Sequence, residues 1–178
     1  MKKILVCFGA ATFLLSCNSE KEKAPGITTD AVAEKSSVEL PYTASYTSSW
    51  STDVSDADLK TVLMSYKDWS DGNMSGLESA MADSVSFDMY TGAHFNLSKA
   101  GLIKMWSTFR DSLSSVKIDM QGWQKMYATD KKETYIVTWY DETDTYKNGK
   151  VDAGSFHDIN QLKDGKIVYY AQYKRPKK

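Results

Sequence analysis

The sequence predicts an α+β domain in which three helices come first and an antiparallel sheet follows. Apolar residues recur with a period close to 3.6 between residues 55 and 113, which is typical of amphipathic helices. From residue 116 onward the period changes to 2, and turn-forming pairs separate the alternating segments. Helices followed by a run of hairpin-connected strands are typical of the α+β class.

The composition is that of an ordinary globular protein. Of the 178 residues, 42% are hydrophobic and 25% are charged, which excludes a wholly disordered, collagen-like or multi-pass membrane chain. The net charge of −1 provides no overall field that would attract nucleic acid. The length allows one domain with an appendage, or at most two very small domains.

The first residues have the pattern of an export signal. Lys2 and Lys3 precede an apolar segment, Ile4 to Leu15, which as a helix would span roughly 18 Å and not the roughly 30 Å of a bilayer core. The following Leu14-Leu15-Ser16-Cys17 resembles the lipobox of bacterial lipoproteins. That resemblance implies a signal peptide over residues 1–16 and acylation of Cys17, for instance with palmitate. The alternative is a plain signal peptide with an incidental cysteine.

A lipid on Cys17 would anchor the exported domain to a membrane of the bacterial cell envelope, with the outer membrane expected. Cleavage before Cys17 would remove Cys7, the other cysteine, so no thiol would remain for a disulfide. The domain must then be stable through its core alone. Whether it faces the periplasm or the exterior is left open.

Residues 17–54 are predicted to form the lipidated cysteine and a flexible tether. Asn18–Val54 is rich in Ser, Thr, Lys and Glu and has no lasting apolar period. The segment Tyr42–Trp50 contains three aromatic residues and could instead dock on the domain as an extra strand. The folded domain is predicted to cover residues 55–178.

Three helices are predicted in the first half of the domain. The first follows a capping box, Ser55-x-x-Asp58, and ends at Asp71-Gly72-Asn73. A short second helix precedes a strand over Val85–Tyr90, a loop that contains His94, and a third helix from Ser98 to about Leu113. The residues predicted to face the core are Leu59, Val62, Leu63, Tyr66, Trp69, Met74, Leu77, Ala80, Met81, Leu102, Ile103, Trp106, Phe109 and Leu113.

Four further strands are predicted in the second half. Asn148-Gly149 and Asp164-Gly165 are strong hairpin signals, because type I′ turns need a positive φ at both central residues. The alternating segments that these turns and residues 129–131 separate are Val116–Tyr127, Glu133–Tyr146, Lys150–Leu162 and Ile167–Tyr173.

Three segments, taken in order, resemble the NTF2-like superfamily, which includes ketosteroid isomerase and SnoaL-type polyketide cyclases. They are Trp69–Met74 with Met81–Phe87, then Asn96–Phe109, and then Leu162–Val168. The resemblance implies a strongly bent antiparallel sheet wrapped around the helices, with a cone-shaped cavity between them. It also implies a possible homodimer through the outer face of the sheet.

The strand around Asp158 is predicted to form a wall of that cavity. Alternation places Phe156, Asp158, Asn160 and Leu162 on one face and His157 on the other. A face of this mixed polarity does not suit a dry core, because a buried carboxylate is costly unless it is paired.

The resemblance to ketosteroid isomerase also implies candidate catalytic residues. Asp88 falls near that enzyme's general base, Asp158 near its protonated carboxylic acid, and Tyr66 near its oxyanion-hole tyrosine. An ionised carboxylate would remove a proton next to a carbonyl, while a neutral carboxyl and a tyrosine hydroxyl stabilise the enolate, without metal or cofactor. The alternatives are a solvated strand end for Asp88, a paired residue on a wet face for Asp158, and a core position for Tyr66.

Five residues are predicted to contact a ligand. Phe156 and Asn160 share the mixed face, Trp106 and Tyr170 offer aromatic rings, and His94 is expected at the mouth of the cavity. Two distant histidines without a cysteine give no zinc ligand set, and no nucleotide-binding or α/β-hydrolase motif is present.

Three functions stay open at this point. The first is a membrane-tethered domain that binds a small apolar or ring-shaped molecule. The second is an isomerase, cyclase or hydratase that uses Asp88 and Asp158. The third is a non-catalytic interaction module of the envelope.

Overall fold

The computed structural model describes residues 39–177, and this part of the chain has three helices and seven strands. The α+β class predicted from the sequence is confirmed. The helices are α1 (Asp56–Asp71), α2 (Met74–Ala80) and α3 (Lys99–Arg110). The strands are β1 (Trp50–Ser51), β2 (Met81–Asp88), β3 (His94–Ser98), β4 (Leu113–Ala128), β5 (Glu133–Tyr146), β6 (Val151–Lys163) and β7 (Lys166–Pro176).

The strands form one sheet in the order β1-β4-β5-β6-β7-β2-β3. Neighbouring strands are antiparallel except for β2 and β7, which are parallel and place Phe87 beside Tyr170. The predicted antiparallel sheet is therefore mixed in one place, where β2 and β7 run parallel. Alternation along a strand indicates its two faces, but it does not indicate which distant strand lies beside it or in which direction.

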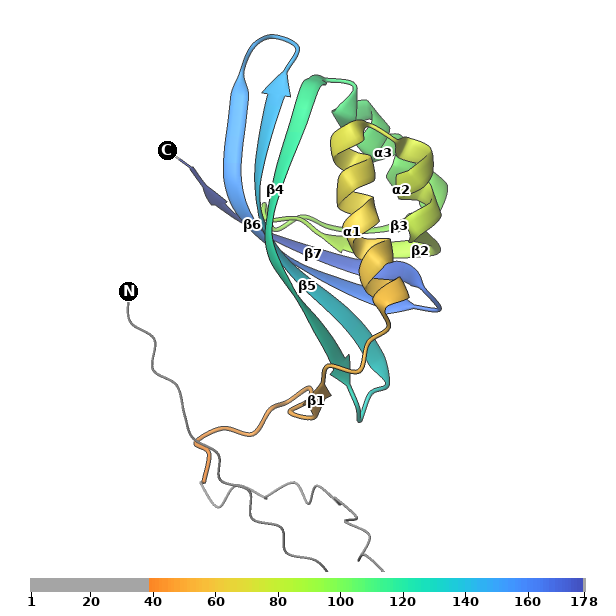
Figure 1. Cartoon of the computed structure of the whole chain (residues 1–178), viewed down its shortest axis with the longest axis vertical. Helices are drawn as coiled ribbons and strands as arrows, with labels where there is room; N and C mark the ends of the chain where they lie inside the picture. Colours follow the sequence, from red (N-terminus) through yellow and green to blue (C-terminus); the bar gives the residue numbers. More distant parts are fainter. Residues whose placement is uncertain (1–38, 178) are drawn as a thin grey trace, which may run out of the picture. The chain divides into compact units, whose positions relative to one another are not determined.

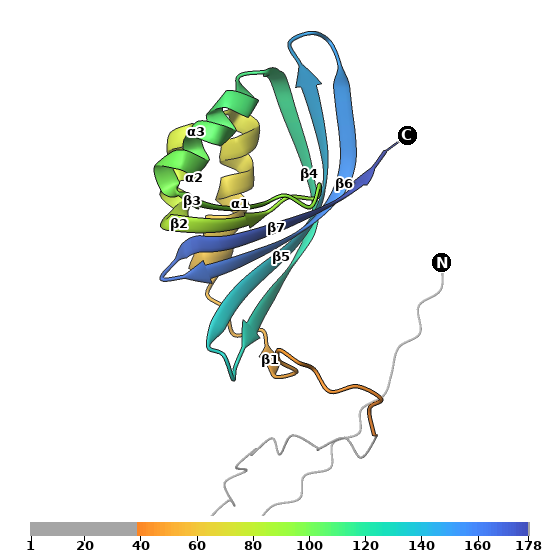
Figure 2. The same cartoon turned by 180° about the vertical axis from the view of Figure 1, so that it is seen from behind.

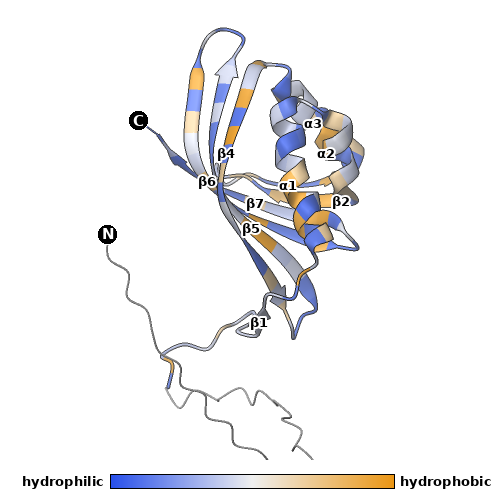
Figure 3. Cartoon of the chain, in the orientation of Figure 1, coloured by the Kyte–Doolittle hydropathy of each residue, from blue (hydrophilic) through white to orange (hydrophobic). Residues whose placement is uncertain are grey.

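All three helices lie on one face of the sheet, as the two opposite views show (Figures 1 and 2). The hydropathy colouring shows apolar residues on the helices and on the strands beneath them (Figure 3). The most deeply buried side chains of this interface include Val62, Leu102, Ile136 and Ile167, none more than 1% exposed. Burial of these aliphatic groups holds the helical layer against the sheet.

Helix α1 has the ends that the sequence predicts. The Ser55 hydroxyl accepts a hydrogen bond from the backbone N–H of Asp58 at 3.0 Å and caps the first turn. Gly72 ends the helix with a φ of +74°, a left-handed conformation that glycine adopts without strain. Between these two ends, Tyr66 and Trp69 lie on the face of α1 that lines the cavity described below.

Two boundaries in the middle of the domain differ from the prediction. Helix α3 ends at Arg110, and Leu113 instead begins β4, opposite Tyr146. The segment predicted as a loop around His94 is strand β3, in which Phe95 and Leu97 alternate with exposed neighbours. Strand pairing with β2 overrides the loop signal, because it satisfies the backbone groups of both segments.

Part of the predicted tether packs against the domain. Trp50 and Ser51 form β1 and pair with Ala128 and Tyr127 of β4. The Tyr46 hydroxyl donates to Glu133, and Val54 is only 6% exposed. The expected extra strand is thus present only at Trp50 and Ser51, the end of the Tyr42–Trp50 segment and the residue after it.

The two predicted hairpin turns differ in detail. Asp164 and Gly165 both have positive φ values, 51° and 73°, as a type I′ turn requires. In the turn between β5 and β6, Gly149 has a positive φ of 84° and Asn148 is not among the positive-φ residues. This loop spans four residues between Tyr146 and Val151, so it does not need the tight two-residue form.

Candidate functional site

A cavity of about 370 Å³ lies between the helices and the inner face of the sheet. Its lining comes mainly from α1, α3 and strands β2, β5, β6 and β7. Even-numbered residues of β5 and β6 face it because side chains alternate along a strand. The register places Tyr140 beside Phe156 and Asn160 beside Tyr170, so rings and polar groups form one continuous wall.

Ten of the residues that line the cavity are aromatic. Phe87 stacks on Tyr170 with ring centroids 5.0 Å apart and meets Trp106 edge-on at 6.0 Å. Tyr140 stacks on Phe156 at 5.2 Å. Stacked and edge-on rings form a rigid apolar surface that suits another ring or a hydrocarbon group.

A hydrogen-bond network centred on Asp158 supports the tyrosine side of the wall. Asp158 is completely buried, and its Oδ2 accepts hydrogen bonds from the hydroxyls of Tyr66 (3.0 Å), Tyr140 (2.7 Å) and Tyr170 (2.9 Å). Asn160 donates to the Tyr66 hydroxyl at 3.1 Å. Burial raises the pKa of Asp158 to about 7, although the three tyrosine hydroxyls stabilise the carboxylate and oppose the rise.

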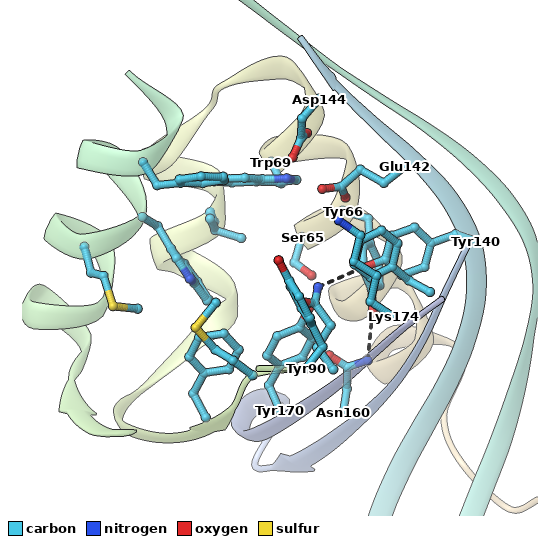
Figure 4. Close-up of a pocket in the computed structure, with 18 of the residues that line it drawn as sticks. Ser65, Tyr66, Trp69, Tyr90, Tyr140, Glu142, Asp144, Asn160, Tyr170 and Lys174 are labelled. Atoms are coloured by element: carbon cyan, nitrogen blue, oxygen red, sulfur yellow. Dashed lines mark hydrogen bonds between the residues drawn. The ribbon is translucent and has the colours of Figure 1, made fainter. Parts of the chain in front are cut away.

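Two carboxyl groups form an acidic part of the cavity beside Trp69. Figure 4 shows Glu142 and Asp144 directed into the cavity from the same strand. Burial, followed by the negative charge of Asp144, raises the pKa of Glu142 to about 8. Burial also raises the pKa of Asp144 above its usual range. The pair is therefore poorly solvated and holds a proton near neutral pH.

An ammonium group already occupies the edge of the cavity. The Nζ of Lys174 pairs with the Oδ2 of Asp152 at 2.8 Å. The same nitrogen lies 5.1 Å from the ring centroid of Tyr90 and 5.4 Å from that of Phe156. The ammonium group is thus stabilised jointly by two aromatic rings and a carboxylate.

A scan of family profiles and a search of curated proteins each found no match to the sequence. Solved structures do match the fold. An NTF2-like protein of unknown function from Burkholderia pseudomallei superposes with a TM-score of 0.54 at 15% identity, over 67% of this chain and 91% of that one. The domain has an NTF2-like fold.

Two other structures share this fold with the domain. An LEH-like epoxide hydrolase from M. tuberculosis matches with a TM-score of 0.58 at 7% identity, over 67% of this chain and 84% of that one. TerC, co-crystallised with polyporic acid, matches with a TM-score of 0.53 at 17% identity, over 67% of this chain and 92% of that one. At these identities the likeness establishes the fold of the NTF2-like domain alone.

Most of the predicted site residues meet in the cavity of the NTF2-like domain. Tyr66, Trp106, Phe156, Asn160 and Tyr170 all line it. The buried residue Asp158, which was expected to face a ligand, lies behind the hydroxyls of three tyrosines. Any effect of its charge on a ligand therefore passes through those hydroxyls.

Asp88 and His94 lie away from the cavity, which corrects the predicted catalytic arrangement. Asp88 follows the cavity-facing Phe87, so alternation turns its side chain to the opposite face, where Tyr169 donates to it at 2.7 Å. His94 pairs with Asp88 at 2.5 Å, and this contact first, then the Tyr169 hydroxyl, lowers the pKa of Asp88. The expected partnership of Asp88 and Asp158 around one ligand atom is therefore absent from the described residues.

Sequence reasoning missed the acidic pair Glu142 and Asp144. The signal was available, because Tyr140, Glu142 and Asp144 alternate along β5 as Phe156 and Asp158 do along β6. Alternation was applied to the strand around Asp158 and not to its neighbour. Applied to both, it would have placed Tyr140, Glu142 and Asp144 on the same wall as Phe156.

The outer face of the sheet carries a second aromatic group. Trp139 stacks on His157 with centroids 5.2 Å apart, and Tyr173 lies 5.9 Å from the same histidine. Trp139 and Tyr173 are 41% and 56% exposed. The homodimer through this face stays a prediction.

Cys17 and the predicted signal peptide over residues 1–16 lie outside the described residues, as does the tether as far as residue 38. Among the helices of residues 39–177, none combines the length and apolar character needed to cross a membrane. The same part of the chain has no group of three His, Cys, Asp or Glu side chains arranged to hold a metal ion.

Proposed function

We propose that the domain binds one small, mainly apolar, ring-shaped molecule in this cavity. The observation that carries the proposal is a space of about 370 Å³ whose wall is mainly aromatic and aliphatic, with polar groups at a few fixed positions. Cavities of this size and character are typical of small-molecule sites. A domain of the same fold, TerC, was crystallised with polyporic acid, which supports a small ligand here.

Ligand binding without turnover is preferred over acid–base catalysis. The enzymatic hypothesis required an ionised Asp88 opposite a neutral Asp158, and the two carboxyls lie on different faces of the sheet. The cavity keeps the features that binding needs, namely apolar area and a few oriented hydroxyl and amide groups. An isomerase, cyclase or hydratase would have to use other residues of the cavity.

The test is a thermal-shift screen with compounds that carry one or two aromatic rings, followed by calorimetry on those that stabilise the protein. A ligand at 100 times its dissociation constant should add about 2.7 kcal/mol to the free energy of unfolding. If no ring compound stabilises the protein or gives a binding heat, the proposal is wrong.

A matched pair of variants locates the binding. Met105 lines the cavity, whereas Met64 lies on α1 outside the lining and is 40% exposed. Met105→Trp should fill part of the cavity and weaken binding at least about tenfold, which corresponds to about 1.4 kcal/mol. Met64→Trp adds the same ring on the surface and should leave the affinity unchanged. Equal affinities in both variants would place the ligand elsewhere.

We also propose that a lipid on Cys17 holds the domain at a membrane of the bacterial envelope. The support is the short apolar segment followed by Leu14-Leu15-Ser16-Cys17. Cys17→Ser should abolish incorporation of labelled palmitate and move the protein to the soluble fraction. Retention of the label in Cys17→Ser would contradict the proposal.

A further inference from the structure

The acidic end of the cavity has no positive partner of its own. Among residues 39–177, neither Glu142 nor Asp144 forms an ion pair. Lys174, the nearest ammonium, is paired with Asp152, and Arg110 donates to the backbone carbonyls of Trp69 and Ser70 at 3.2 Å. Two buried carboxyl groups thus face a ligand-sized space without an ion pair of their own.

Asp144 provides a second, independent sign of a missing partner. Its side chain lines the cavity, the residue is only 8% exposed, and its Oδ1 has no hydrogen-bond partner among the described residues. Buried polar atoms are nearly always paired, so such an atom beside a cavity points to a group that a ligand would supply. A carboxylate oxygen accepts hydrogen bonds, so the expected group is a donor or a cation.

Aromatic rings surround the same end of the cavity. Trp69 stacks on Phe109 with centroids 6.0 Å apart and planes 3° apart, and Tyr146 meets Phe109 edge-on at 6.3 Å. All three line the cavity. The faces of such rings attract ammonium groups and repel anions. Lys174 over Tyr90 and Phe156 is an example of this contact within the same cavity.

From these contacts we infer that the cavity takes a hydrophobic amine, with its ring among Phe87, Trp106 and Tyr170 and its ammonium group beside the Glu142–Asp144 pair. This inference rests on the proposed function and specifies that the ligand carries a positive charge. The apolar part of the ligand gains from burial and stacking. The ammonium group neutralises carboxylates that have no ion-pair partner among the described residues.

Binding of a cation should release a proton from the pair. In the empty cavity the pair holds a proton near neutral pH, because the pKa of Glu142 is raised to about 8. An ammonium group stabilises the doubly ionised pair, so its affinity should increase as the pH rises through this pKa. The other titratable or charged groups that act on the pair are Arg110 on α3, Tyr140 and Tyr146 on β5, Asp152 and Asp158 on β6, and Tyr170 and Lys174 on β7.

The experiment compares three probes of one shape by calorimetry on the full-length protein. They are 2-phenylethylammonium, the neutral propylbenzene and the anionic 3-phenylpropanoate. The ammonium probe should bind at least about tenfold more tightly than the neutral one, and the anion should bind most weakly. Equal binding of the three overturns the amine inference and leaves the proposed function standing. Absence of binding by all three, together with a failed ring screen, overturns both.

Variants then assign the preference to the pair. Glu142→Gln with Asp144→Asn should remove the preference for the ammonium probe while the neutral probe keeps its affinity. Asp141→Asn is the matched control, because Asp141 directly precedes Glu142 on β5 and pairs on the outer side with Ser155 and Lys177. It should keep the full preference. A preference that persists in the double variant overturns the inference.

A measurement on the wild-type protein tests the inference even if the variants do not fold. Benzyltrimethylammonium keeps its charge at every pH, so any pH dependence of its binding belongs to the protein. Its affinity should increase at least about fivefold between pH 6 and pH 8, since the fraction of the pair that is fully deprotonated, and so able to bind the cation, increases over this range. An affinity that is constant over this range overturns the inference.

Discussion

Asp158→Asn tests the buried network behind the cavity. Asp158 is fully buried and its pKa is raised from 3.8 to about 7 by burial. The folded protein therefore binds a proton at Asp158 in a pH range in which the unfolded chain has released it. Stability falls as the pH rises wherever the folded state binds more protons, so this carboxyl destabilises the domain progressively between pH 4 and pH 7.

The magnitude follows from the size of the shift. One pKa unit corresponds to 1.36 kcal/mol, so the full change from 3.8 to about 7 is worth about 4 kcal/mol. Between pH 5 and pH 8 the wild-type protein should lose about 3 kcal/mol through Asp158. Asn cannot ionise, and Asp158→Asn should lack this loss. At pH 5 the variant should be the less stable protein by about 1–3 kcal/mol, because its amide N–H groups replace an oxygen that has no donor or acceptor beside it.

Urea denaturation at pH 5, 6, 7 and 8 measures the free energy of unfolding of the wild-type protein and of Asp158→Asn as a function of pH. The stability difference between Asp158→Asn and wild type should shift in favour of the variant by about 3 kcal/mol across the series. Asp141→Asn is the control, because Lys177 and then Ser155 lower the pKa of Asp141 and place its titration below this range. Parallel curves for wild type and Asp158→Asn would refute the view that Asp158 is a desolvated carboxyl.

Three further changes probe the fold and the outer face. Leu102→Ala removes a side chain with no exposed surface and should cost about 2–5 kcal/mol in urea denaturation; a loss below about 1 kcal/mol would indicate a loosely packed helical layer. Gly72→Ala puts a Cβ at a φ of +74° and should cost about 1 kcal/mol or more, measured as a lower melting temperature. Asp88→Asn should leave ligand affinity unchanged, because the residue faces away from the cavity. It should also reduce the loss of stability on acidification that His94 and Tyr169 produce by lowering the pKa of Asp88, and a weakened ligand affinity would contradict its assigned position.

The elements that could be predicted from the sequence are those with local causes. The Ser55 cap and the glycine at position 72 define α1 within one turn at each end, because both act through backbone groups of neighbouring residues. Asp164-Gly165 fixes a tight turn for the same reason. The parallel pairing of β2 with β7 has no such local cause, and neither alternation nor turn chemistry indicates it.

Site residues could be predicted where alternation along a single strand was enough to assign them to the cavity. Alternation around Asp158 identified Phe156 and Asn160 as cavity residues. The placement of Asp88 depended on a resemblance between sequences, and a shift of one residue along a strand reverses the face that a side chain occupies. Phe87, its neighbour, faces the cavity in its place.

Asp158 and Glu142 both have raised pKa values, but only Glu142 can contact a ligand directly. Asp158 receives three tyrosine hydroxyls on one oxygen, and those hydroxyls separate it from the cavity, so its main effect is to hold the tyrosines in position. Glu142 lines the cavity directly, and the two cations that act on its neighbour Asp144, Lys174 and Arg110, are paired or hydrogen-bonded elsewhere. A ligand can lower the free energy of a buried charge only where that charge lacks partners. A cationic ligand should therefore gain most of its electrostatic binding free energy at Glu142 and Asp144. Neutral variants of this pair should lose the preference for a cation and keep the cavity.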